Sequence, residues 1–179
     1  MNLSPRYSGL STINHWITVL LVIAMLALGL VAAEAPTEIA EEYVLGVHIS
    51  LGFFAFFFIV WRIAYRLREG FPPTLESTAT ERWAAYVVHR LLLVVLALQV
   101  LTGPLYLFTE GEGVNVFGWF SVYLPLESLE AIHEPMEEIH KIVGAYVIPL
   151  LLLLHIAGAI KHYLRADVTA DDQQTPADM

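Results

Sequence analysis

Apolar residues gather in four long stretches of this chain, and the short segments between the stretches hold most of its charges. The stretches cover about 11–33, 43–65, 83–108 and 138–163. Each is long enough to cross a bilayer, because a transmembrane helix needs about 20 mostly apolar residues. The pattern predicts an all-α membrane protein, a bundle of four transmembrane helices in up-and-down order that forms a single membrane domain over 1–179.

Two polar segments complete this plan. Residues 109–137 form the longest connection, on the outer side, and their glycine, proline and aromatic residues predict a packed cap with a short helix at the membrane surface. Residues 167–179 are polar and acidic, which predicts a disordered tail.

The cations predict the orientation of the bundle. Eight of the nine Lys and Arg flank span ends that share one side, and Lys141 alone falls on the other side. Because basic flanks stay in the cytoplasm, both termini should be cytoplasmic. The opposite side collects most of the glutamates, so the net charge of −9 points outward. This charge gives no support for nucleic acid; it suits a cationic periplasmic partner or plain solvation of the loops.

Composition narrows the chemistry further. Hydrophobic residues make up 57% of the chain, with a mean hydropathy of +0.63, which is typical of a protein whose partner is the lipid bilayer. Cysteine is absent, which excludes thiolate-ligated haem, cysteine-ligated iron–sulfur clusters and covalently attached haem.

Histidines occur inside the spans, where ionisable side chains are costly and indicate function. His48 and His140 lie toward the outer side, whereas His15, His89 and His155 lie toward the inner side. In a regular helix, the fifteen residues from His140 to His155 correspond to about 22 Å along the axis and about 60° around it. Two imidazoles at matching depth on different helices are the ligands of a bis-histidine haem. At the inner side, the pattern leaves either His15 or His89 as the partner of His155.

Neighbouring residues support haem sites at both levels. Gly52 follows His48 at i+4, and Gly144 follows His140 at i+4, so a porphyrin could approach the backbone there. Arg90 and Arg62 are candidates for binding the propionates of an inner haem, with topology alone as the other explanation. Lys141 could do the same for an outer haem, while His133 and His162 are expected either at the surface or as neighbours of the ligands.

The chain resembles the bacterial cytochrome b561 family of dihaem four-helix membrane cytochromes, over about residues 6–167. The matching segments are Ile13-Asn14-His15-Trp16, Val47-His48-Ile49-Ser50-Leu51-Gly52, Trp61-Arg62, His89, His140-Lys141-Ile142-Val143-Gly144 with His155, and Lys161-His162-Tyr163.

The resemblance implies two haems b per chain, in which His48 and His140 bind the outer iron and His15 and His155 bind the inner iron. His89 then becomes an additional inner histidine, near the propionates or a quinone.

The resulting functional hypothesis is electron transfer across or within the membrane, between a periplasmic donor such as superoxide and ubiquinone. The alternative is a cytochrome b anchor subunit that passes electrons for a larger redox enzyme. A third class, a metal transporter or membrane di-iron enzyme, is suggested by the spacing Glu137-x-x-His140, but the first three spans hold no carboxylates to complete such a site.

Overall fold

The computed structural model describes residues 9–71 and 78–172, with side chains as far as Leu164. Four helices in this part of the chain are long and apolar enough to cross a membrane. They are α1 (Gly9–Ala33), α2 (Glu38–Glu69), α3 (Ala79–Glu110) and a composite fourth helix over Glu127–Leu164. The predicted all-α fold with four transmembrane helices is confirmed.

The fourth membrane helix is not uniform. It begins with the 3₁₀ turn η1 (Glu127–Ile132) and α4 (His133–Ile142), passes through the π-helical turn η2 (Val143–Val147), and continues as α5 (Ile148–Asp172). The segment 167–172 of the predicted tail is therefore helical, and 173–179 lie outside the described residues. The π turn lies between His140 and His155, so the two histidines are not joined by regular α-helix.

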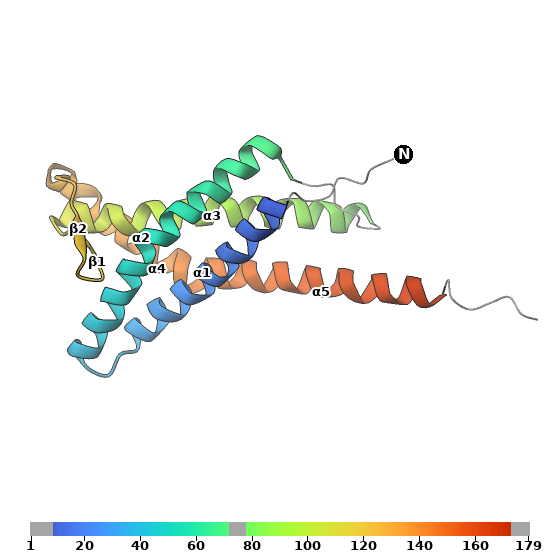
Figure 1. Ribbon diagram of the computed structural model, residues 1–179, viewed down its shortest axis with the longest axis horizontal. Coiled ribbons are helices and arrows are strands. Elements are labelled where there is room, and N and C mark those ends of the chain that lie inside the picture. Colours follow the sequence, from blue (N-terminus) through green and yellow to red (C-terminus); the bar gives the residue numbers. More distant parts are fainter. Residues whose placement is uncertain (1–8, 72–77, 173–179) are drawn as a thin grey trace, which may run out of the picture.

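The helices form two pairs that cross each other. In Figure 1, α1 and α2 run side by side and lie obliquely across α3 and α5, which extend along the long axis of the molecule. Apolar side chains from all four membrane helices form the core where the pairs meet: Val22, Ala55, Ile59, Val95, Leu96, Val143, Ile148 and Leu151. Outside this core, large apolar side chains such as Leu20 and Leu153 remain exposed, as expected for a surface covered by lipid.

Local sequence signals set the helix ends. Thr37 caps α2 by accepting a hydrogen bond from the backbone N–H of Ala40 at 3.2 Å. Thr78 and Glu81 form a reciprocal capping box at the start of α3. The same helix ends at Gly111, whose φ of 86° is the left-handed conformation that glycine adopts most readily.

The connection between α3 and α4, on the predicted outer side, is a folded cap. It contains an antiparallel hairpin of β1 (Val114–Val116) and β2 (Phe120–Val122), followed by η1. Ser50 of α2 fastens the hairpin: its hydroxyl donates to the Asn115 carbonyl at 3.0 Å and accepts from the Phe117 N–H at 3.0 Å. The cap therefore packs on α2 only two residues from His48. The sequence predicts a packed cap with a short helix, but it does not predict the hairpin or its contact with Ser50.

Candidate haem sites

Two of the predicted histidines face each other at the level that the charge pattern predicts to be the outer one. His48 of α2 and His140 of α4 have ring centres 6.2 Å apart, and their planes are inclined by 86°. With metal–nitrogen bonds of about 2 Å and a ring radius of about 1.1 Å, imidazoles on opposite sides of one ion have centres about 6 Å apart. The two rings therefore have the separation that one iron between them requires.

The third membrane helix holds the His140 ring in place. Nδ1 of His140 is 3.2 Å from the backbone carbonyl oxygen of Gln99 and 3.3 Å from the hydroxyl of Thr102, and both residues belong to α3. Because a carbonyl oxygen only accepts, Nδ1 carries the proton, and Nε2 keeps the lone pair that a metal needs. The side-chain amide of Gln99 donates to the His140 carbonyl at 3.2 Å and to Nε2 at 3.2 Å, so a bound iron would replace the second of these hydrogen bonds. Gln99 and Thr102 thus fix both the tautomer and the direction of this ring.

Glycines on neighbouring helices give the outer rings their space. A Cβ on Gly103 of α3 would lie 2.9 Å from Cε1 of His140, and a Cβ on Gly29 of α1 would lie 3.5 Å from Cε1 of His48. The two glycines predicted from the sequence, Gly52 and Gly144, do not lie against a histidine ring. A Cβ on Gly52 would lie 3.3 Å from the Met25 side chain, and one on Gly144 would lie 2.9 Å from the Gln99 amide.

At the inner level, His155 of α5 is flanked by two histidines. The ring centre of His15, on α1, is 6.4 Å away with a plane inclination of 82°. The ring centre of His89, on α3, is only 5.1 Å away, at 70°. His89 also stacks on Phe71, with planes 21° apart. The separation from His15 matches a shared iron, while His89 lies closer than that geometry allows.

Arginines surround the inner group. Arg66 is buried, and its guanidinium donates to the Ser11 hydroxyl at 2.8 Å and to the Gly70 carbonyl at 3.3 Å. Arg62 donates to the side chain of Asn14 at 3.4 Å, one residue before His15. The predicted residue Arg90 lies over the Tyr86 ring, 3.3 Å from its centre, and 4.6 Å from the centre of Phe71.

The donor set suits b-type haem. Each matched pair offers two neutral imidazoles from different helices, and axial histidines are common haem-iron ligands. Within the described residues, no group of three or more His, Cys, Asp or Glu side chains could hold a metal ion by itself. The alternative based on Glu137-x-x-His140 therefore finds no further ligands in that part of the chain, whereas a macrocycle that supplies four equatorial nitrogens needs only two.

Comparison with known proteins gives the same result. The model of the family described as prokaryotic cytochrome b561 matches residues 6–171, almost the whole chain. The chain belongs to this family. It is also 28% identical, over 168 residues, to cytochrome b561 homolog 2 of Escherichia coli (strain K12), a match that covers 90% of this chain and 87% of that protein.

Family membership establishes the general function. The protein is a b-type cytochrome of electron transport that binds haem b and crosses the bacterial inner membrane several times. The resemblance drawn from the histidine spacing is thus confirmed.

Several residues at the sites were not predicted from the sequence. Gln99 carried a usable signal, because it is the only amide in the apolar stretch 83–108, and polar groups inside a span need a partner. Asn14, directly before His15, carried the same signal and is almost fully buried. Gly29 and Gly103 carried none, since their roles depend on which helix packs opposite each histidine.

Proposed function

We propose that the chain binds two haems b, one at each side of the membrane, and transfers electrons between them. His48 and His140 hold the outer iron, and His15 and His155 hold the inner iron. The observation that carries this proposal is the pair of ring separations, 6.2 Å and 6.4 Å, each between imidazoles of different helices. A position on opposite halves of the bilayer follows from the fifteen residues between His140 and His155, which give a rise of about 21 Å when the π turn absorbs one of them.

His89 is proposed as a neighbour of the inner haem and not as a ligand. Its ring lies 5.1 Å from that of His155 and stacks on Phe71, so an aromatic contact already holds it beside the ligand. An imidazole in this position can donate to a propionate or to a bound quinone. Removing it should change the electronic environment of the inner site without removing an axial bond.

The arginines and Lys141 are proposed to receive the propionates. Arg62 and Arg66 lie beside His15 on the α1–α2 pair, and Arg90 follows His89 on α3. Guanidinium groups bind carboxylates through two parallel hydrogen bonds, which also neutralises the negative charge in a medium of low dielectric. Lys141 is the cation at the outer level and forms an ion pair with Glu137 at 2.7 Å.

The side chains contribute axial ligation, orientation and exclusion of water. Bound haem b supplies reversible one-electron chemistry, which the amino-acid side chains do not provide. The apolar core between the two levels keeps water away from the route, while Gln99 and Thr102 keep His140 in its ligating tautomer. With both termini in the cytoplasm, electrons from a periplasmic donor pass inward to ubiquinone. The glutamate-rich outer side favours a cationic donor over an anion such as superoxide.

Single histidine variants test this proposal. His48→Ala or His140→Ala should remove the outer low-spin haem and leave the inner one, and His155→Ala should do the reverse. Electron paramagnetic resonance of the oxidised protein in mild detergent distinguishes the two species. His162→Ala, at the inner membrane surface, is the matched control and should retain both. Loss of the same single signal in the His140 and His155 variants would show that these histidines do not serve separate haems.

A further inference from the structure

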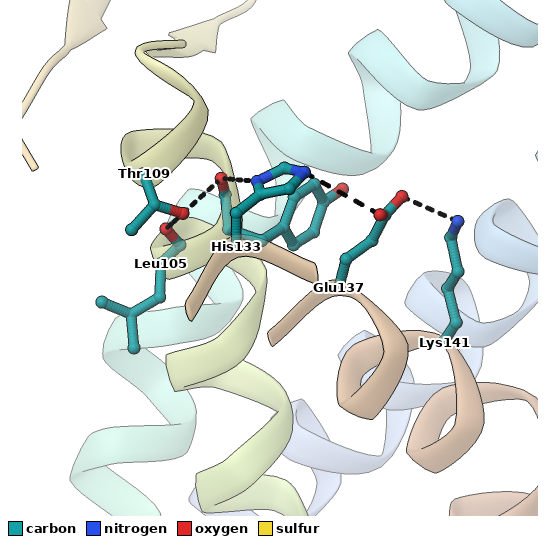
Figure 2. A network of polar contacts seen from close by, with 6 residues as sticks. Leu105, Thr109, His133, Glu137 and Lys141 are labelled. Atoms are coloured by element: carbon teal, nitrogen blue, oxygen red, sulfur yellow. Dashed lines mark hydrogen bonds and ion pairs between the residues drawn. The ribbon is translucent and has the colours of Figure 1, made fainter. Parts of the chain in front are cut away.

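A polar network lies beside the outer site, at the start of the fourth membrane helix. Figure 2 shows His133, Glu137 and Lys141 in succession along α4, one turn apart, with the His133 ring against the outer end of α3. Nδ1 of His133 is 3.0 Å from the Tyr106 carbonyl, and Nε2 is 3.9 Å from a Glu137 oxygen, whose partner oxygen is 2.7 Å from the Lys141 ammonium.

This geometry prepares His133 to bind a proton. The Tyr106 carbonyl accepts only, so Nδ1–H donates to it and the neutral ring turns an unprotonated Nε2 toward the carboxylate. The lone pair of His133 Nε2 then faces a carboxylate oxygen of Glu137 across 3.9 Å. Protonation of Nε2 converts this contact into an ion pair. His133 also lines a cavity of about 470 Å³ with Glu130, Ala131 and Glu134, which gives it access to outer water.

The network is close enough to sense charge at the outer haem. The Tyr106 ring lies between His133 and His140, 6.1 Å from the first ring centre and 5.9 Å from the second. The His133 and His140 ring centres are therefore at most about 12 Å apart. Across that distance, at an effective dielectric of about 20, one unit of charge changes an equilibrium by about tenfold.

We propose that His133 takes up a proton from outer water when the outer haem is reduced. The electron comes from a one-electron donor outside the membrane, and the proton binds at Nε2 of His133, so the charge added at the site is partly neutralised. The groups beside this ring are Tyr106 from α3, Glu130 from η1, and Glu134 and Glu137 from α4, with Lys141 bound to the far oxygen of Glu137. This inference rests on the proposed outer haem.

The test is a potentiometric titration of the outer haem at several pH values between about 5 and 8, the range in which histidine titrates. Protonated His133 stabilises the reduced form, so the outer potential should fall as the pH rises. In His133→Gln, the total fall of the outer potential over this pH range should be smaller by about 59 mV. For one electron, this difference corresponds to a tenfold change in an equilibrium constant. Glu137→Gln should shrink it also, since the counter-charge is gone, and His162→Gln should leave it unchanged.

Electron paramagnetic resonance of each oxidised variant, recorded first, distinguishes a failure of the proposed outer haem from a failure of the proposed proton site. If the outer low-spin signal is absent from the unaltered protein, the proposed function fails. If the signal is present in the unaltered protein and in His133→Gln, and both show the same pH dependence, the proton site is overturned. A second variant, His133→Lys, carries a fixed charge and should hold the potential near its low-pH value at pH 8; a wild-type fall in this variant would also contradict the proposal.

Discussion

Gly103 lies so close to His140 that a Cβ on it would stand 2.9 Å from the Cε1 atom of the imidazole. Neither residue is near the other in the chain: Gly103 belongs to α3 and His140 to α4. The contact means that the position of this proposed haem ligand is set by the absence of a side chain on another helix.

The first prediction follows from this contact. Gly103→Ala should displace the His140 ring, at a cost of about 1–3 kcal/mol for overpacking, and should weaken or remove the outer haem while sparing the inner one. The optical spectrum and electron paramagnetic resonance of the purified variant measure both. Gly46→Ala is the matched control, because a Cβ there meets nothing within 4 Å. An undisturbed outer signal in Gly103→Ala would mean that the ring has room that the structure does not show.

The second prediction concerns the inner pair. His15→Ala should abolish the inner low-spin haem, because the 6.4 Å separation from His155 is the one that spans an iron. His89→Ala should keep two bis-histidine haems and shift only the inner potential, because a neighbouring donor is lost and the axial bonds remain. Electron paramagnetic resonance combined with redox titration measures both effects. The reverse outcome, with the inner signal surviving in His15→Ala and lost in His89→Ala, would exchange the roles of the two residues.

The third prediction concerns the π turn. In a regular α-helix, His140 and His155 would lie about 60° apart around the helix axis. A π turn accommodates one extra residue, so the two histidines lie about 40° apart, in the opposite direction around the axis. Deleting Ala145, within Val143–Val147, should restore regular α-helix and retain both haems. Deleting Leu153 instead, beyond the turn, should rotate His155 by about 100° and remove the inner haem. The number of haems per chain in the two deletion variants tests this prediction. Equal loss of haem from both variants would show that the π turn does not accommodate an extra residue.

Much of this architecture could be predicted from the sequence. The apolar stretches determined the four membrane helices, because lipid leaves the backbone no alternative to helix at such lengths. The histidines could be sorted by depth, since depth follows from residue number along a span, and the structure brings His48 to His140 and His155 to His15.

The remainder depends on contacts between helices. The hairpin at Val114–Val122 is short and relies on Ser50 of another helix, so its own residues gave too weak a signal. The choice between His15 and His89 needed ring separations, which periodicity does not give. The π turn is not predicted, because one regular helical period over 138–163 leaves no place for it.

The haem content of the purified protein tests the central claim most directly. Pyridine haemochrome absorbance, divided by the protein concentration from amino-acid analysis, gives the number of haems b per chain. The two histidine pairs predict about two haems per polypeptide, both six-coordinate and low-spin in the oxidised protein. A reproducible value of one haem or none, in a preparation whose helical content is intact, would contradict the account.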